Sequence, residues 1–221
     1  MQRNISSRAD IEWASDTKPR VTNFYTFSKR LFDIVVAATG LLLLAPMIAV
    51  LGLLIKLESS GPVLFSQSRC GLKGAPFRFW KFRSMVVDAE AHKTQLMQKT
   101  KGDLRFKMVD DPRITRLGKF IRKYSIDELP QLWNVLIGDM SLVGPRPPLP
   151  EEVAQYSARA WHRLDVIPGI TCTWQIGGRS QIPFPQQVEL DLSYIRTRTL
   201  LNDFIILLRT PVAVLAARGA C

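Results

Sequence analysis

Two adjacent acidic residues with arginines on either side are the clearest candidates for chemistry in this 221-residue chain. Asp127 and Glu128 lie in the segment Ser125–Gln131 (SIDELPQ), between Arg122 and Arg146. An ionised Asp near guanidinium groups that can bind phosphate could attack a phosphorus atom, as aspartyl-phosphate enzymes do. No Ser-His-Asp set, P-loop or GxGxxG motif offers a competing site in the sequence. The pattern is therefore compatible with phosphoryl transfer.

The same residues also fit an ordinary helix start. Ser125 and Glu128 have the spacing of a capping box, and acidic residues are favoured in the first turn of a helix. Pro130 prefers the first helical position, so the helix could instead begin there, with the acidic pair on the preceding loop. In both cases the helix dipole and the neighbouring arginines favour the carboxylate forms. On the residues alone, capping and catalysis both stay open.

A long apolar run must place this segment relative to a membrane. Residues 34–55 carry no charge and would form a helix about 33 Å long, enough to cross a hydrocarbon core of roughly 30 Å. Pro46 lies just past the middle, where it removes a backbone donor. Basic residues flank both ends, which favours the cytoplasm for both flanks: Lys18, Arg20, Lys29, Arg30, Lys56, Arg69 and Lys73. A simple span and a helix that bends at Pro46 and returns are both consistent, and a soluble core helix fits less well.

The net charge of +11 is concentrated in one block. Residues 69–123 hold 15 Lys/Arg and 5 Asp/Glu, with aromatic residues between them. Such a block favours a polyanionic partner, either the phosphates of lipids and nucleotides or a nucleic acid. Three widely spaced cysteines and two histidines argue against a disulfide framework and a Cys/His zinc site.

The remaining pattern predicts short elements rather than a large sheet. Short strands are expected at 63–65 and 77–82 around a turn at 71–74. Helices are expected at 88–101, 114–124, 131–137 and 151–164, with the basic 114–124 helix able to lie along an anionic membrane. A shaped loop is expected at 139–150, and a loop or short sheet at 168–180. Residues 200–217 are apolar, but their longest uncharged piece is too short to span, which favours a helix pair that lies in the interface or packs beneath the first hairpin.

Six ordered motifs give a resemblance to a known family. They are KRLFD (29–33), KFRSM (81–85), DELPQ (127–131), GDMSLVGPRP (138–147), PGIT (168–171) and ELDxxY (189–194). Together they resemble the monotopic phosphoglycosyl transferases, the bacterial sugar transferase family that initiates surface-polysaccharide and glycoconjugate synthesis. The similarity runs from about Ser28 to Ala217.

The resemblance implies an α+β, mainly helical fold with a re-entrant membrane helix hairpin broken at Pro46. The hairpin would cover residues 26–60 after an irregular leader at 1–25. A small mixed catalytic domain at the interface would follow at 61–198, and amphipathic interfacial helices at 199–221. The implied location is the bacterial inner membrane, with the active site facing the cytoplasm.

The resemblance also implies a reaction and its residues. A nucleoside diphosphate sugar, usually of uridine, would donate a sugar phosphate to polyprenyl (undecaprenyl) phosphate. Asp127 would be the nucleophile, Glu128 would help hold Mg²⁺, and Asp191 would be a further acidic residue near the site. The expected phosphate-binding residues are Arg122, Arg146, Arg179, Lys81 and Arg83. Membrane lipids, a second copy of the chain and downstream glycosyltransferases are the expected partners, and nucleic acid is not.

Two departures from the family pattern bear on these expectations. Ala45 stands where many relatives have Ser before the hairpin proline, and Gly177 stands where they often have Asn. The first departure affects the geometry of the hairpin. The second affects the substrate contacts of the loop that contains Gly177. A membrane-anchored nucleic-acid binder and an adaptor without catalysis remain the alternatives, although neither explains the Asp-Glu pair.

Overall fold

The computed structural model describes residues 22–89 and 111–216. Most of the expected leader, nearly all of the expected helix at 88–101 and the C-terminal residue Cys221 lie outside the described residues. The described part is a mixed α and β structure in which helices predominate, as the sequence predicts.

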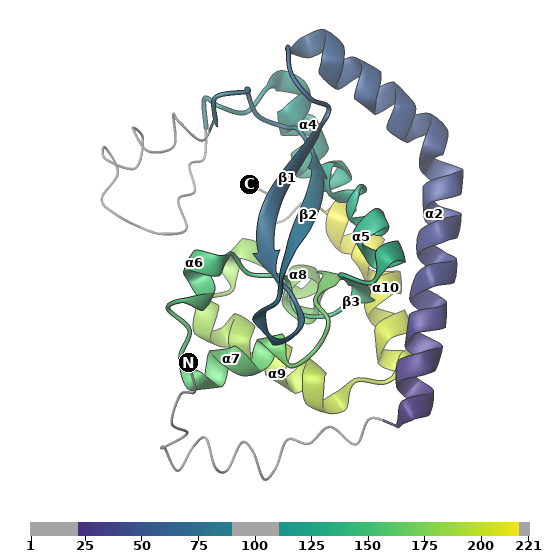
Figure 1. Cartoon of the computed structure of the whole chain (residues 1–221), viewed down its shortest axis with the longest axis vertical. Helices are drawn as coiled ribbons and strands as arrows, with labels where there is room; N and C mark the ends of the chain where they lie inside the picture. The colour runs from purple at the N-terminus through teal and green to yellow at the C-terminus, as the bar shows by residue number, and fades with distance from the viewer. Residues whose placement is uncertain (1–21, 90–110, 217–221) are drawn as a thin grey trace.

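The first described helix, α2 (Asn23–Glu58), contains the whole apolar run. The Thr22 hydroxyl caps it by accepting a hydrogen bond from the backbone N–H of Tyr25 at 3.3 Å. Its 36 residues give a length of roughly 54 Å. Figure 1 shows α2 as one long, curved helix along the edge of the molecule, continuous through Pro46. The structure therefore does not confirm the expected hairpin of two helix arms, since the proline removes one backbone hydrogen bond without ending the helix.

Most of α2 faces away from the protein. Among the described residues it is the one helix long and apolar enough to cross a membrane, and only 11% of its most apolar 18-residue stretch is buried. Ala37, Leu51 and Ile55 are its buried apolar residues. A core helix of a soluble protein would be mostly covered, so the exposed apolar surface indicates association with a membrane.

A two-stranded antiparallel sheet follows α2. Strands β1 (Leu64–Cys70) and β2 (Pro76–Phe82) are joined through the 3₁₀ turn η1 (Leu72–Gly74). The predicted second strand and turn are confirmed, whereas the first strand extends five residues beyond its predicted end at residue 65. Figure 1 shows the two strands as a long hairpin beside α5.

Short elements make up the rest of the described chain. In chain order these are α4 (Arg116–Lys123), η2 (Ile126–Glu128), α5 (Gln131–Ile137), β3 (Ser141–Val143), α6 (Pro150–Val153), α7 (Ala158–Trp161), η3 (His162–Leu164), β4 (Gly169–Thr171), α8 (Thr173–Gly177), η4 (Arg179–Gln181), α9 (Phe184–Thr197) and α10 (Leu200–Leu215). The predicted helix at 131–137 matches α5 at both ends, because Pro130 and Gly138 bound it. The predicted helix at 151–164 is three short pieces. The predicted C-terminal helix pair is one helix, α10, which continues through Pro211.

The amide of Asn134 attaches α5 to the sheet. Its Oδ1 accepts a hydrogen bond from the backbone N–H of Trp80 at 3.2 Å, and its Nδ2 donates to the carbonyl of Arg78 at 2.6 Å. These are the two backbone groups that a further strand would pair with at this edge of β2. The side chain is fully buried, so α5 is fixed against the hairpin.

The KRLFD motif of α2 fixes the other elements to this helix. Arg30 donates to the carbonyls of Val135 and Leu136 near the end of α5, at 2.6 and 2.8 Å. Asp33 Oδ1 accepts from the backbone N–H of Leu142 in β3 at 3.1 Å.

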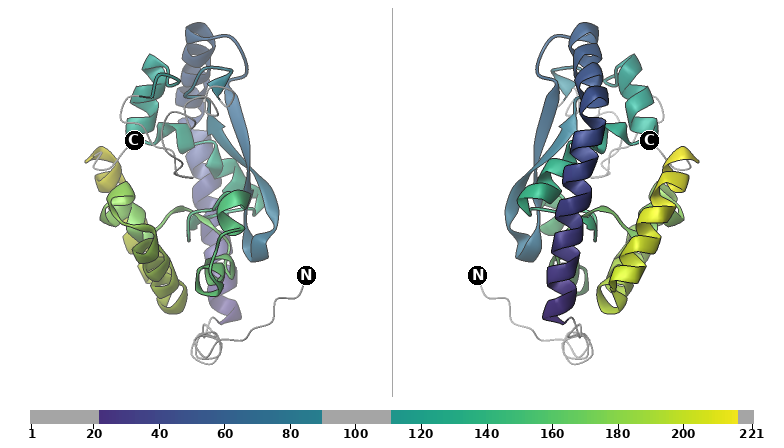
Figure 2. Two further views of the ribbon diagram at one scale, coloured as in Figure 1. Left: turned by 90° about the vertical axis from the view of Figure 1, so that its left-hand side faces the viewer. Right: turned by 90° about the vertical axis from the view of Figure 1, so that its right-hand side faces the viewer.

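A third contact of the motif joins α2 to the C-terminal helix. Lys29 pairs with buried Asp203 of α10 at 2.8 Å. Figure 2 shows α2 and α10 meeting near their N-terminal ends and diverging from there. The predicted membrane helix is therefore part of the folded domain.

Candidate functional site

Asp127 and Glu128 lie on the 3₁₀ turn η2, immediately before α5. Ser125 precedes the turn in the left-handed region, with φ of 54°, and its side chain caps no helix. The α5 helix begins only at Gln131, after Pro130. Of the two helix starts that the sequence allowed, the structure has the one at the proline, and the capping box is not formed. The acidic pair is therefore available for another role.

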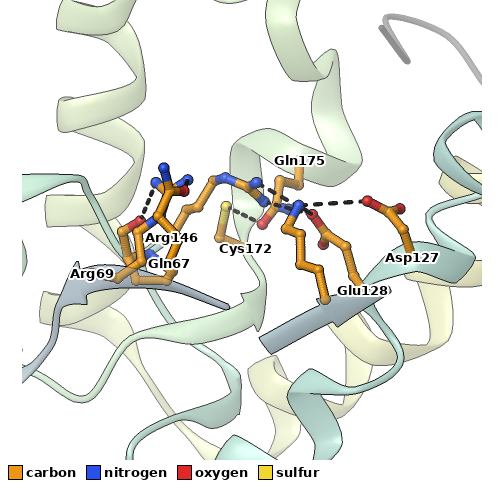
Figure 3. A network of polar contacts seen from close by, with 9 residues as sticks. Gln67, Arg69, Asp127, Glu128, Arg146, Cys172 and Gln175 are labelled. Atoms are coloured by element: carbon orange, nitrogen blue, oxygen red, sulfur yellow. Dashed lines mark hydrogen bonds and ion pairs between the residues drawn. The ribbon is translucent and has the colours of Figure 1, made fainter. Parts of the chain in front are cut away.

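Two cations hold Glu128. Lys81 Nζ lies 2.9 Å from Glu128 Oε1, and the two terminal nitrogens of Arg146 lie 3.2 and 3.3 Å from the same oxygen. Lys81 Nζ is also 3.6 Å from Asp127 Oδ2, which is an ion pair but a looser one. Figure 3 shows Glu128 between Arg146 and Asp127 in one polar network. Asp127, which is buried, is thus the less firmly paired of the two neighbouring carboxylates.

The two carboxyl groups respond to this environment in opposite directions. Burial alone would raise the pKa of Glu128, but its attraction to Lys81 and Arg146 outweighs burial and holds the pKa well below its usual value. For Asp127 burial is the larger effect, and with the charge of Glu128 it raises the pKa above the usual value despite the pull of Lys81. The neighbouring cations do favour the carboxylate form of Asp127, as the sequence predicts, but its burial, which the sequence did not reveal, outweighs them and leaves the pKa raised.

One face of the β1–β2 hairpin supplies cations to the site. Gln67 pairs with Phe79, Arg69 with Phe77, and Lys81 lies two residues beyond Phe79, so side-chain alternation brings them all to one face. The Arg69 guanidinium and the Lys81 ammonium both contact the ring of Phe79, at 5.3 and 5.4 Å from its centre. Sequence reasoning missed Arg69, because the predicted first strand stopped at residue 65. Extending the alternation of β2 across the turn would have been the signal.

A tight crossing of two backbones positions Arg146. Strands β3 and β4 pair in parallel, and the N–H groups of Gly144 and Gly169 donate across to Thr171 and Pro145 at 3.0 and 2.9 Å. A Cβ atom added at Gly169 would collide with the backbone N and O of Gly144. Glycine is required at this crossing because the two backbone segments leave no room for a side chain.

Replacing Gly169 with Ala should therefore destabilise the protein and misplace Arg146. We expect a loss of about 1–3 kcal/mol in the free energy of unfolding, the usual effect of forced overpacking. Thermal melting in detergent measures it. Gly177→Ala is the matched control, because its Cβ would meet only Ile182 Cδ1 at 3.9 Å, an ordinary contact. Equal melting temperatures for the two variants would contradict the role of the crossing.

Two predicted site residues lie elsewhere. Arg83 donates to the carbonyls of Ser59 and Ser60 at 2.8 and 2.5 Å, just past the end of α2, and its side chain is buried there. Asp191 is fully buried and pairs with Arg163 at 2.8 Å. Neither is brought together with the acidic pair. Within the described residues Arg83 is bound at the end of α2 and Asp191 in the core, although Arg83 Nε and Asp191 Oδ1 are buried without a hydrogen-bond partner.

The other two predicted arginines are placed less directly. Arg122 on α4 lowers the pKa of Asp127 through its charge, which puts it within electrostatic range of that carboxylate. Arg179 opens the 3₁₀ turn η4 with a left-handed φ of 52° and is partly exposed. No ion pair joins Arg179 to the acidic pair within the part of the chain that the structure describes.

Comparison with known proteins identifies the family of this site. The sequence model of the bacterial sugar transferases matches residues 24–217. The chain belongs to this family. The six motifs predicted the same assignment, and the matched bacterial sugar transferase region contains every residue of the site described above.

Named relatives agree with this assignment. Galactosyl transferase CpsE of Streptococcus agalactiae is 48% identical over 203 residues, which are 89% of this chain and 45% of that protein. The undecaprenyl-phosphate galactose phosphotransferase of Salmonella typhimurium is 40% identical over 199 residues, 88% of this chain and 42% of the relative. The UDP-glucose:undecaprenyl-phosphate glucose-1-phosphate transferase of Caulobacter vibrioides is 42% identical over 200 residues, with shares of 87% and 71%. This bacterial sugar transferase spans less than half the length of the first two.

The acidic pair also bears on the metal that the family resemblance implies. No group of three or more His, Cys, Asp or Glu able to hold a metal ion occurs among the described residues. Mg²⁺, however, usually takes only one or two carboxylates from a protein and completes its shell with water and substrate phosphates. Only Oε1 of Glu128 is held by the two cations. Asp127 and Glu128 therefore fit Mg²⁺ when a diphosphate is bound beside them.

Proposed function

We propose that this chain transfers a sugar phosphate from a nucleoside diphosphate sugar to polyprenyl phosphate, through a phospho-sugar intermediate on Asp127. One observation carries the proposal: two neighbouring carboxylates differ sharply in how they are paired. Glu128 is held by Lys81 and Arg146, while Asp127 keeps one loose ion pair and is destabilised by burial. A buried anion that its partners do not fully neutralise is suited to attack phosphorus.

The proposed reaction has two displacements. A carboxylate oxygen of Asp127 attacks the β-phosphorus, and the bond from that phosphorus to the bridging oxygen breaks, so its electron pair leaves with the nucleoside monophosphate. An oxygen of the polyprenyl phosphate then attacks the same phosphorus. The bond to Asp127 breaks and the carboxylate is restored. The product is a polyprenyl diphosphate sugar.

The surrounding cations have distinct tasks in this scheme. Lys81 lies between Asp127 and Glu128, so it can contact the transferring phosphoryl group while remaining paired with Glu128. Arg146 offers a planar donor group next to it, which suits phosphate oxygens. Mg²⁺, held through Glu128, would neutralise charge on the diphosphate. Stabilising this gathered negative charge is the main catalytic contribution expected of such a site.

The membrane helix supports the proposed acceptor. A polyprenyl tail is soluble in the bilayer, whereas the sugar nucleotide is soluble in water, so both meet only at the membrane surface. The exposed apolar face of α2 and its contacts with α5 and β3 keep the site at that boundary. We propose that this membrane is the bacterial inner membrane with the site on its cytoplasmic face, and that the path of α2 there is re-entrant.

Release of nucleoside monophosphate tests the proposal. Detergent-purified protein with Mg²⁺ should release UMP from at least one member of a UDP-sugar panel, beginning with UDP-glucose and UDP-galactose. Without acceptor the release should stop at one equivalent per active site, and undecaprenyl phosphate should restart it. Absence of UMP release from every donor would contradict the proposed reaction. Release that always requires the acceptor would contradict the covalent intermediate.

A further inference from the structure

Arg69 is an incompletely paired cation at one end of the polar network. Its two terminal nitrogens donate to the carbonyl of Pro147 at 3.1 Å and to Gln67 Oε1 at 2.9 Å, both uncharged acceptors. Its buried Nε has no hydrogen-bond partner. No carboxylate lies within ion-pair distance of Arg69 among the described residues. The guanidinium therefore has an unused donor and no directly paired carboxylate, and Glu152 and Glu128 act on its charge only from a distance.

A second guanidinium lies next to Arg69. Burial, followed by the like charge of Arg146, lowers the pKa of Arg69 to about 10. Figure 3 shows Arg69 and Arg146 side by side, with Asp127 at the opposite end of the network. Two neighbouring guanidinium groups repel each other, and an anion between them turns that repulsion into two attractions. Their arrangement is thus typical of a site for a phosphate.

The order of the groups matches the geometry of phosphoryl displacement. In such a displacement the attacking and leaving oxygens lie roughly in line on opposite sides of the phosphorus. With Asp127 on one side, the leaving phosphate must depart on the other. The acceptor phosphate must then attack from that same side, because Asp127 is now the leaving group. One anion site opposite Asp127 would therefore be used in both steps.

We propose that Arg69, with Arg146, forms this second phosphate site, which binds first the leaving nucleoside monophosphate and then the phosphate of the polyprenyl acceptor. The inference rests on the proposed function and adds a substrate-binding residue to it. The cations then have different ligands. Lys81 contacts the phosphoryl group on Asp127, while Arg69 binds the phosphate of the leaving nucleoside monophosphate or of the incoming acceptor. The two substrates consequently compete for one position.

The test compares Arg69→Gln with Arg78→Gln. Arg78 is exposed and pairs with Ser68 on the opposite face of the same hairpin, so its variant removes the same charge without touching the site. In wild-type protein UMP should inhibit competitively with undecaprenyl phosphate. Arg69→Gln should raise both the inhibition constant of UMP and the KM of undecaprenyl phosphate by ~10–100-fold, the effect of losing a charge-assisted contact. Arg78→Gln should leave both constants unchanged.

Arg69→Lys separates binding from folding. It keeps the charge but loses the planar pair of donors, so it should fall between wild type and Arg69→Gln in UMP inhibition, and it serves as the test variant if Arg69→Gln does not fold. A lower kcat with unchanged constants for UMP and acceptor in both Arg69 variants would overturn the inference and leave Arg69 a structural residue. Failure of wild-type protein to release UMP would instead overturn the proposed function, so the two failures are distinguishable.

Discussion

Replacing Asp127 with Asn should reduce turnover by at least about 10³-fold, because removing a covalent nucleophile leaves only binding and electrostatic contributions. The change keeps the size of the side chain and removes its charge. Incubation with a UDP-sugar followed by intact-protein mass spectrometry should show a sugar-phosphate adduct on wild-type protein and none on the variant. Asp165→Asn, at an exposed carboxylate paired with His162, is the matched control and should keep full activity.

The same variant should be no less stable than wild type. The pKa of Asp127 is raised in the folded protein, so between its usual value of 3.8 and the higher folded value the folded state binds more protons than the unfolded state. Stability therefore declines as the pH rises through that window, and Asn removes this loss at neutral pH. Full activity of Asp127→Asn, or an adduct at another residue, would contradict the assignment. A variant that is inactive only because it has unfolded would be recognised by its melting curve.

Replacing Glu128 with Gln should have the opposite effect on stability. The amide oxygen of Gln can still accept hydrogen bonds, but Lys81 and Arg146 would lose the negative charge that both pair with, leaving two partly buried cations without it. We expect a loss of about 2–3 kcal/mol in the free energy of unfolding, since removing one partner leaves partly buried charges unpaired, and this destabilises the protein by more than the intact pair stabilises it. Thermal melting at neutral pH measures the loss, and turnover should fall as well, because the cations lose their positions.

The dependence on pH distinguishes this effect from a packing defect. The folded pKa of Glu128 lies below its usual value of 4.5, so its stabilising contribution is fully present above pH 4.5 and is lost as the pH falls through the folded pKa. The stability gap between wild type and Glu128→Gln should therefore narrow on acidification. Glu151→Gln, at an exposed carboxylate on α6, is the control. A gap that stays constant down to acid pH would indicate that the lost contacts are steric.

Elements whose ends are marked by proline or glycine could be predicted from the sequence. Pro130 and Gly138 bound α5 on both sides, and the glycines of the hairpin turn mark its position. The first strand was predicted too short because residues 66–69 (SQSR) are all polar, so no apolar alternation marks its second half. The break between α6 and α7 lies before Ser157, whose hydroxyl caps α7 by accepting a hydrogen bond from the backbone N–H of Ala160 at 3.2 Å. This N-cap was the local signal that a single predicted helix at 151–164 overlooked.

Burial and orientation explain why the site was only partly predicted. The acidic pair and Arg146 were found because residue type and spacing suffice to suggest phosphate chemistry. The resemblance implied a phosphate-binding role for Arg83, whereas the structure places its guanidinium against the carbonyls of Ser59 and Ser60, a contact that only folding creates. The raised pKa of Asp127 depends on neighbours brought in by folding. Neither effect can be deduced from spacing along the chain.

The contacts of α2 have a practical consequence for anyone who wants a water-soluble fragment. Cutting the chain after residue 58 would remove more than an anchor, because Arg30 and Asp33 satisfy backbone groups of α5 and β3. It would also uncover the apolar cluster in which Leu51 and Ile55 pack with Phe82 and Ile121. Polar replacements restricted to the lipid-facing side of α2, with its inward side chains retained, are therefore the rational route to solubility.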